Sequence, residues 1–197
     1  PKISSFLSSV LGVPCTLARF PASFASRHAK AHLSTSNSKT STLLAFSNES
    51  PVLCISRMSV NALNKTIKAK GGTPVPASTF RANIVVSQPL HLPPGTETPY
   101  VEDSWTSLAI TDKRGSAGQQ NDGSKADFKV LGKCRRCHML CVDQQTAETR
   151  QEPFVTLAKT RREDGKVWFG VHLALSKGEK RGWVRVGDRV TAMRLSY

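Results

Sequence analysis

The segment DFKVLGKCRRCHMLC, residues 127–141, joins the pattern of a β-strand to a dense group of cysteines. Its first half, DFKVLGK, predicts a strand that runs straight into the group. Cys134, Cys137 and Cys141 then follow within eight positions, and two arginines separate the first pair. The segment therefore predicts a strand that delivers clustered thiols and fixed positive charge to one loop.

Other stretches on both sides of this segment carry the β-branched runs or the alternation of strands. They are PVLCI (51–55), FRANIVVS (80–87), EDSWTSLAI (102–110), KVWFGVHLAL (166–175) and WVRVGDRVTAMRL (183–195). In the last of these, Val184, Val186 and Val190 are expected to face inward. No repeating βαβ rhythm is evident. The pattern predicts a mainly β fold with a few α-helices, built as an irregular β-barrel or as two sheets.

Three segments carry helix signals. The first places Ile3, Phe6, Leu7, Val10 and Leu11 on one face and stops at Gly12. The second starts from Ser59 as N-cap and ends at Gly71-Gly72, and the third spans EPFVTLAKTRR, residues 152–162.

The N-terminal region allows two interpretations. Residues 1–48 contain no Asp or Glu and are rich in Ser and Thr, as mitochondrial transit peptides are. However, the first helix runs into the alternating Val13, Cys15 and Leu17, and this favours the interior of a domain. Residues 26–41 and 111–126 are polar and predict a flexible loop and a flexible insertion. The chain starts with Pro1, which suggests an N-terminally truncated fragment.

Composition limits the classes of function. The chain has 197 residues, of which 39% are hydrophobic, and this suits one domain with a packed core. Its formal net charge of +14 predicts an anionic partner. Five cysteines cannot form a complete set of disulfides, and no apolar run reaches the roughly 20 residues of a membrane span. A cytoplasmic protein without a membrane anchor is expected.

The cysteine loop itself leaves three interpretations open. A structural zinc site needs four ligands, and no second ligand pair stands at the usual spacing. Cys141 suits packing as a small hydrophobe, in an extended segment that would set Cys137, Met139 and Cys141 on one side. In the third interpretation, Arg135 and Arg136 favour a thiolate at Cys137 and offer paired donors to a phosphate or a planar heterocycle.

Six stretches in order point to a family: FRANIVVS, EDSW, CRRCHMLCVDQQT, EPFVTLAKTRR, FGVHLAL and VRVGDRV. This series resembles the MOSC domain, a β-barrel module that binds the molybdenum cofactor. FLSSVLGVPCTLARFP and LLAFSNESPVLCISRMSVNALN, which precede it, look like the same domain in the C-terminal part of fungal-like molybdenum cofactor sulfurases. The resemblance implies one MOSC domain over residues 1–197, and it argues against a transit peptide.

The resemblance also implies a set of site residues. The second cysteine of the family's motif, here Cys137, would be the molybdenum ligand and the catalytic residue. Arg136 precedes it, and Arg81 and Asn83 match a strand that would reach the pterin or phosphate of the cofactor. With Arg135 they form the expected cofactor-binding set.

Two other features follow the same motifs with smaller roles. Asp143 would support the loop, whereas the acidic pair Glu102-Asp103 would cap a turn. Ala147 departs from the family, where a glycine is usual, so the turn there would differ.

What the resemblance implies for function is transfer of sulfur. The module would hold the molybdenum cofactor (Mo-molybdopterin) while an oxo ligand is exchanged for a sulfido ligand, as part of a sulfurtransferase. Sulfur would come from a pyridoxal-phosphate cysteine-desulfurase domain that this chain lacks, and the product would serve xanthine dehydrogenase and aldehyde oxidase. One alternative is an amidoxime-reducing molybdenum module. Another is a basic nucleic-acid-binding module with zinc in the cysteine loop, although no aromatic platform for stacked bases is evident.

Overall fold

The computed structural model describes most of the chain. The described residues are 2–19, 21, 27–28, 43–44, 47, 49–88, 93, 96–111, 126–176 and 183–194. Of the expected loop over 26–41, only Arg27–His28 lies within the described residues, as a short strand. Thr111 and Ala126, the ends of the expected insertion, belong to strands, and 112–125 lies outside the described residues. The flexibility of both segments therefore stays a prediction.

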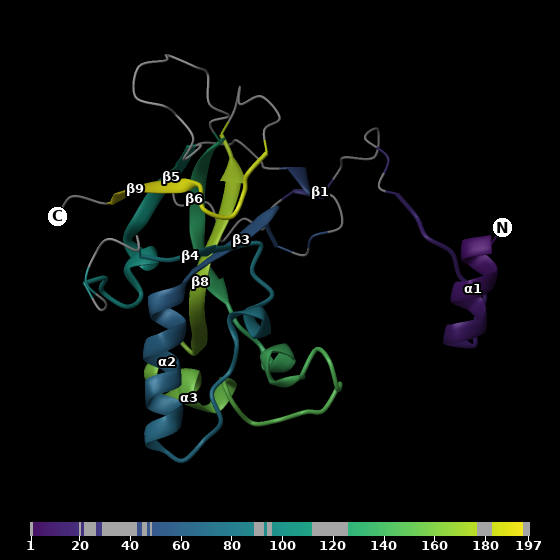
Figure 1. Ribbon diagram of the computed structural model, residues 1–197, viewed down its shortest axis with the longest axis horizontal. Coiled ribbons are helices and arrows are strands. Elements are labelled where there is room, and N and C mark those ends of the chain that lie inside the picture. Colours follow the sequence, from purple (N-terminus) through teal and green to yellow (C-terminus); the bar gives the residue numbers. More distant parts are fainter. Residues whose placement is uncertain are drawn as a thin grey trace.

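The body of the molecule is a seven-stranded, nearly closed sheet with the shape of a barrel (Figure 1). Along the sheet the order is β4-β3-β8-β6-β5-β9, and β7 pairs with β8 at one end. The strands are β3 (Val52–Ser56), β4 (Ile84–Val86), β5 (Trp105–Thr111), β6 (Ala126–Arg135), β7 (Arg162–Glu163), β8 (Lys166–Leu175) and β9 (Arg189–Arg194). A separate pair joins β1 (Arg27–His28) to β2 (Leu43–Leu44). The expectation of a mainly β, barrel-like fold with a few helices is confirmed.

One pair of strands in this sheet is parallel. β3 and β4 run side by side with α2 (Arg57–Ala69) between them in the chain, whereas the other pairs are antiparallel. This is a single βαβ unit, and it does not repeat along the described strands. A helix of 13 residues supplies the long crossover that a parallel pair requires.

The strand expected over residues 80–87 is also shorter than its pattern. A 3-10 helix, η3 (Ala77–Phe80), comes first, and Arg81 ends it with a left-handed backbone at φ 54°. A residue in that region cannot continue an extended ladder, so β4 begins only at Ile84.

Helix α2 begins three residues earlier than its sequence signal suggested. The cap is Ser56, whose side chain accepts a hydrogen bond from the backbone N–H of Met58 at 3.1 Å. Ser59 lies fully buried inside the helix and binds Glu102 instead. The helix ends at Ala69, before Gly71 adopts a left-handed backbone.

Two clusters of buried side chains form the core. The first packs α2 and α3 (Phe154–Thr160) against the sheet, and Phe80 and Phe169 stack within it with ring centroids 4.1 Å apart. The second fills the barrel between β5, β6 and β8. Between them, Gly170 has φ 76°, and a Cβ there would come within 2.7 Å of the carbonyl oxygen of Cys54. The backbones of β3 and β8 approach this closely because position 170 has no side chain.

Near both ends of the described chain, two expected strands differ from the structure. α1 (Lys2–Leu11) forms as predicted but buries no side chain, and residues 13–17 after it form no strand. β9 begins only at Arg189, and Val184 and Val186 are exposed, while Val190 packs against the second core cluster. Alternating or helical spacing predicts an apolar face, but it does not determine whether another element covers that face. Within the described residues, no helix is both long and apolar enough to cross a membrane.

Candidate functional site

The cysteine loop connects the end of β6 to a short 3-10 helix, η5 (His138–Cys141). Cys137 stands at the N-cap position of η5 with an extended backbone, and it is exposed. Leu140 and Cys141 turn inward and are buried. The expected extended segment, with Cys137 and Cys141 on the same side, was wrong because the chain coils into a 3-10 turn. That turn separates Cys137 from the packed thiol of Cys141.

Arg136 is the buried member of the arginine pair, with 9% of its surface exposed. Its guanidinium donates one hydrogen bond to Cys134 Sγ at 3.1 Å and another to the carbonyl oxygen of Phe80 at 2.7 Å. Its backbone N–H binds the carbonyl oxygen of Val167 at 2.8 Å. Arg136 therefore joins three segments of the fold, and its charge lies beside Cys134.

The three thiols of the loop differ in environment. Burial raises the pKa of Cys134, although the adjacent charge of Arg136 lowers it in part. Burial also raises the pKa of Cys141, whose Sγ donates to the carbonyl oxygen of Gln151 at 3.3 Å. Cys137 is the exposed thiol of the loop, and it is the one that a large ligand could reach.

Arg81 and Asn83 lie on the segment between η3 and β4. Arg81 is exposed, and its backbone N–H closes the end of η3. Asn83 is tied to β3, because its side-chain oxygen accepts from the N–H of Leu53 at 2.8 Å and its own N–H donates to the Leu53 carbonyl at 2.9 Å. The amide oxygen of Asn83 therefore binds the backbone of β3, and Arg81 is exposed to solvent.

Two contacts hold this segment against the cysteine loop. One is the bond from Arg136 to the carbonyl oxygen of Phe80, next to Arg81. The other runs from Gln144 Nε2 to the carbonyl oxygen of Ser78 at 3.0 Å. Residues 56 and 66 positions apart in the sequence therefore meet at one edge of the barrel, as the expected site requires. Phe80 and Gln144 lie within stretches that carry the family resemblance, but the sequence assigned them no role, because both act by position in the fold.

The turn after the loop is organised by Asp143. Its Oδ1 accepts from the backbone N–H groups of Gln145 at 2.9 Å and Thr146 at 3.1 Å, and these bonds lower the pKa of Asp143. Ala147 closes the turn with a left-handed backbone at φ 60°. The conformation is the one that glycine adopts most easily, so alanine keeps the shape of the turn at some conformational cost.

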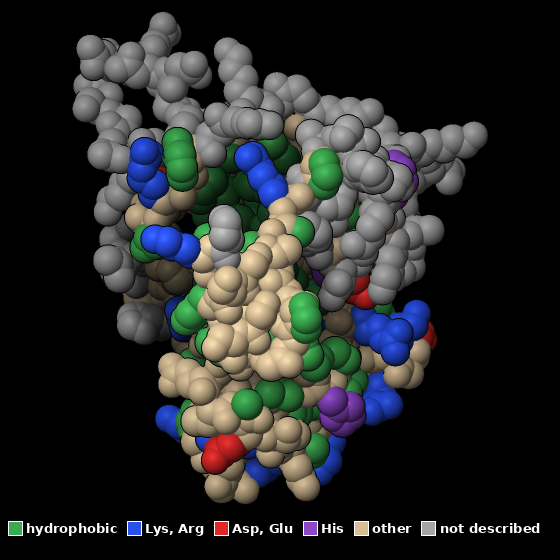
Figure 2. Space-filling view, turned by 90° about the vertical axis from the view of Figure 1, so that its right-hand side faces the viewer, with side chains coloured by type: hydrophobic (Ala, Val, Ile, Leu, Met, Phe, Trp, Pro, Cys, Tyr) green, Lys and Arg blue, Asp and Glu red, His purple; other side chains and the backbone are tan. Residues whose placement is uncertain are grey.

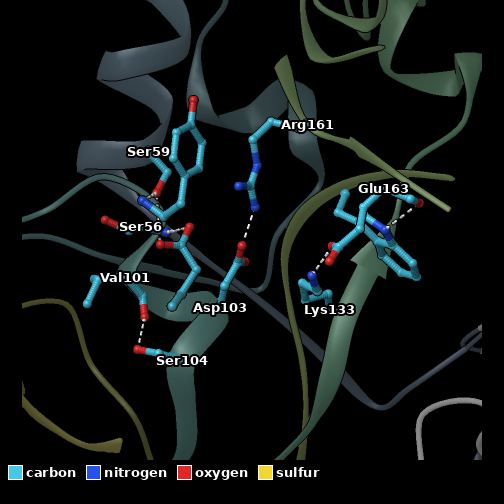
Figure 3. Close-up of polar contacts among 11 residues, drawn as sticks. Ser56, Ser59, Val101, Asp103, Ser104, Lys133, Arg161 and Glu163 are labelled. Carbon is cyan, nitrogen blue, oxygen red and sulfur yellow. Dashed lines mark hydrogen bonds and ion pairs between the residues drawn. The ribbon is translucent and has the colours of Figure 1, made fainter. Parts of the chain in front are cut away.

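The acidic pair Glu102-Asp103 holds elements together (Figure 3). Glu102 is fully buried and accepts from the backbone N–H of Ser56 at 3.2 Å and from Ser59 Oγ at 2.8 Å. Burial raises the pKa of Glu102, although the bond from Ser59 opposes the shift. Asp103 forms an ion pair with Arg161. Both carboxyl groups lie in the short 3-10 helix η4 (Val101–Ser104), where they join this segment to α2 and to Arg161 and do not cap η4 itself.

Basic side chains are common on one face of the molecule. Lys and Arg side chains predominate over Asp and Glu on the face that Figure 2 presents. Arg135 is exposed at the end of β6, directly before the buried Arg136. Of the expected set, Arg81, Asn83, Arg135 and Cys137 are exposed, whereas Arg136 is buried.

One further group of polar side chains was missed by sequence reasoning. Glu49, Cys134 and His172 bring three donor atoms within 4.8 Å of one another. They are far apart in the sequence and match no spaced motif. The only sequence signal was His172 itself, because it interrupts the apolar run of β8, which is buried over most of its length.

Fold and loop together define a small barrel-like module that presents one exposed cysteine among basic side chains at its rim. The model of the MOSC domain family matches residues 42–191, and the chain belongs to that family. It is 40% identical to the molybdenum cofactor sulfurase of Botryotinia fuckeliana over 96% of its length. It is 41% identical to the protein of that name from Aspergillus niger over 97%, and the chain spans 26% of each of these two relatives. The expected resemblance is confirmed.

Proposed function

We propose that this chain is the module that binds the molybdenum cofactor in a molybdenum cofactor sulfurase. The observation that carries the proposal is the exposed thiol of Cys137, held at the N-cap of η5 in a chain whose similar relatives bear that name. The cofactor is the substrate here, and it supplies the metal at which an oxo ligand is replaced by a sulfido ligand.

The residues at this edge fit such a substrate. A thiolate is a soft ligand that suits molybdenum, and guanidinium groups bind phosphate through paired hydrogen bonds. Cys137, Arg81 and Arg135 are all exposed, so each can meet an anionic molecule from solvent. The formal net charge of +14 also favours an approaching anion.

Each residue of the set would have a distinct task. Cys137 would bind the metal, and Arg81 and Arg135 would orient the phosphate. Arg136 and Asn83 would act indirectly, since their contacts with Phe80 and Leu53 hold the backbone that carries the binding groups. Charge-assisted hydrogen bonds to a phosphate contribute roughly 1.5–3 kcal/mol each.

The wider reaction is part of the same proposal. A cysteine-desulfurase domain with pyridoxal phosphate would supply the sulfur, and xanthine dehydrogenase and aldehyde oxidase would receive the finished cofactor. All five cysteines are free, which suits the reducing conditions of the cytoplasm.

The test is the molybdenum and pterin content of chain purified from a host that makes the cofactor. Cys137→Ala should lose most of both, while its circular dichroism spectrum stays that of the wild type. Cys15→Ala is the matched control, because this thiol lies outside the loop and its loss should leave the content unchanged. Retention of molybdenum by Cys137→Ala would remove Cys137 from the site.

A further inference from the structure

We propose that Glu49, Cys134 and His172 form a second site, which adjoins the cysteine loop but does not include Cys137, and that this site binds a zinc-like divalent ion. Their ligand atoms all lie within 4.8 Å of one another. Thiolate, imidazole and carboxylate are the three ligand classes of zinc, and a tetrahedral site places such atoms roughly 3.3–3.6 Å apart. Nε2 of His172 and Oε2 of Glu49 are already 3.2 Å apart. Only a small movement of Cys134 Sγ would complete the set.

Two of the three proposed ligands lie on paired strands, and Glu49 lies in a bend just before β3. Cys134 lies on β6 and His172 on β8, and these strands pair with each other. His172 also pairs across to Leu53 on β3, so strands flank it on both sides. Irregularities in the β6–β8 register occur between Val130 and Gly132 and again between Lys133 and Arg135. The second lies at Cys134 itself, and bulges of this kind redirect side chains at functional sites.

The imidazole of His172 is oriented as a metal ligand would need. Ser50 Oγ lies 3.0 Å from the carbonyl oxygen of Val52, to which it donates, and 2.7 Å from Nδ1 of His172. The contact with Ser50 holds the ring so that Nε2 faces Oε2 of Glu49 at 3.2 Å. A second polar partner that orients the ring is a regular feature of zinc-bound histidines.

Charge and access also suit a metal ion. Cys134 and His172 are each 5% exposed, so the donors are largely dry. Arg136 donates to Cys134 Sγ at 3.1 Å, so a positive charge lies beside the sulfur that would bind the metal as a thiolate. The side chain of Glu49 is 23% exposed and gives the site an opening to solvent. Three protein ligands with an open position are typical of zinc sites that bind an exchangeable fourth ligand.

The test uses the purified 197-residue chain with zinc and with cobalt(II) as an optical probe. Wild-type chain should retain about one zinc per molecule after gel filtration, and cobalt should give the visible absorption of a tetrahedral thiolate site. Cys134→Ser and His172→Gln should each lower zinc affinity at least about 10-fold, and Ser50→Ala should lower it about 10-fold through the imidazole. Zinc should also raise the melting temperature of the wild type.

The control is Cys137→Ser, which should bind zinc like the wild type although it loses molybdenum. If the zinc proposal fails, the proposed binding of the cofactor at Cys137 can still hold. If cofactor binding at Cys137 fails, the zinc proposal can still hold. If the wild type shows neither retained zinc, nor a cobalt spectrum, nor a rise in melting temperature, the three residues form only a buried ion pair beside a thiol, and the proposal is overturned. Loss of zinc binding in Cys137→Ser would overturn it too, because Cys137 would then be a ligand of the metal.

Discussion

Adjacent arginines at the end of β6 offer a direct test of how the cysteine loop is held. Arg136 is 9% exposed, and its guanidinium binds Cys134 Sγ and the carbonyl oxygen of Phe80. Arg135 is exposed and belongs to the rim. Replacing each by methionine keeps most of the length of the side chain and removes its charge. The two substitutions therefore separate a buried anchor from a surface charge at neighbouring positions.

The expected cost of Arg136→Met follows from its contacts. Two hydrogen bonds from a charged donor contribute roughly 1.5–3 kcal/mol each, or about 3–6 kcal/mol together. Burying the guanidinium is itself unfavourable, and methionine relieves that cost while packing on Phe80. We expect a net loss of about 2–4 kcal/mol in the free energy of unfolding. Arg135→Met should change it by no more than about 0.5 kcal/mol, as surface substitutions usually do.

The assay is urea denaturation of both variants and the wild type, followed by tryptophan fluorescence and circular dichroism. Arg136→Met should unfold at clearly lower urea with an unchanged slope, and Arg135→Met should overlay the wild type. Equal midpoints for the two variants would refute the reasoning, because the contacts of Arg136 would then contribute nothing to the fold.

Two more predictions concern the turn and the buried carboxyl group. Ala147→Gly should raise the free energy of unfolding by about 0.5–1 kcal/mol, since relief of the left-handed backbone outweighs the added freedom of the unfolded chain. As a control, Ala62→Gly, inside α2, should lower the free energy of unfolding by about 1 kcal/mol. If Ala147→Gly also lowered it, the account of the turn would be contradicted. The raised pKa of Glu102 means that the folded chain binds its proton more tightly than the unfolded chain, so stability must fall as pH rises from the ordinary pKa of 4.5 toward the folded value. Wild-type stability minus that of Glu102→Gln should therefore decline with pH above 4.5 and then level off, and a flat difference would show that no such shift exists.

The strands that the sequence predicted best are those with buried neighbours on both sides. β8 occupies residues 166–175 as expected, because its apolar run lies between β3, β6 and the core. β6 leads into the cysteine loop as expected. The misplaced helix start had a different cause: Ser56 and Ser59 both satisfy the preference for an N-cap, and the buried Glu102, far along the chain, determined which one serves.

The position of the candidate site could be predicted from the sequence, but the separate roles of its residues could not. The cluster of cysteines and arginines marked the loop, and the family resemblance selected Cys137. Arg135 and Arg136 look alike in the sequence, but in the structure Arg136 is buried and Arg135 is exposed. The difference arises because only the fold brings the Phe80 carbonyl close to Arg136. The group of Glu49, Cys134 and His172 could not be predicted either, because only the fold brings these three residues together.

The most direct measurement of the central claim is the alkylation of Cys137 in cofactor-free and cofactor-loaded chain, with the labelled peptides quantified by mass spectrometry. Cys15, half-buried and outside the loop, serves as the internal reference. If Cys137 binds molybdenum, iodoacetamide should label it readily in the free chain and poorly in the loaded chain, while labelling of Cys15 stays the same. Equal labelling of Cys137 in both states would contradict the account.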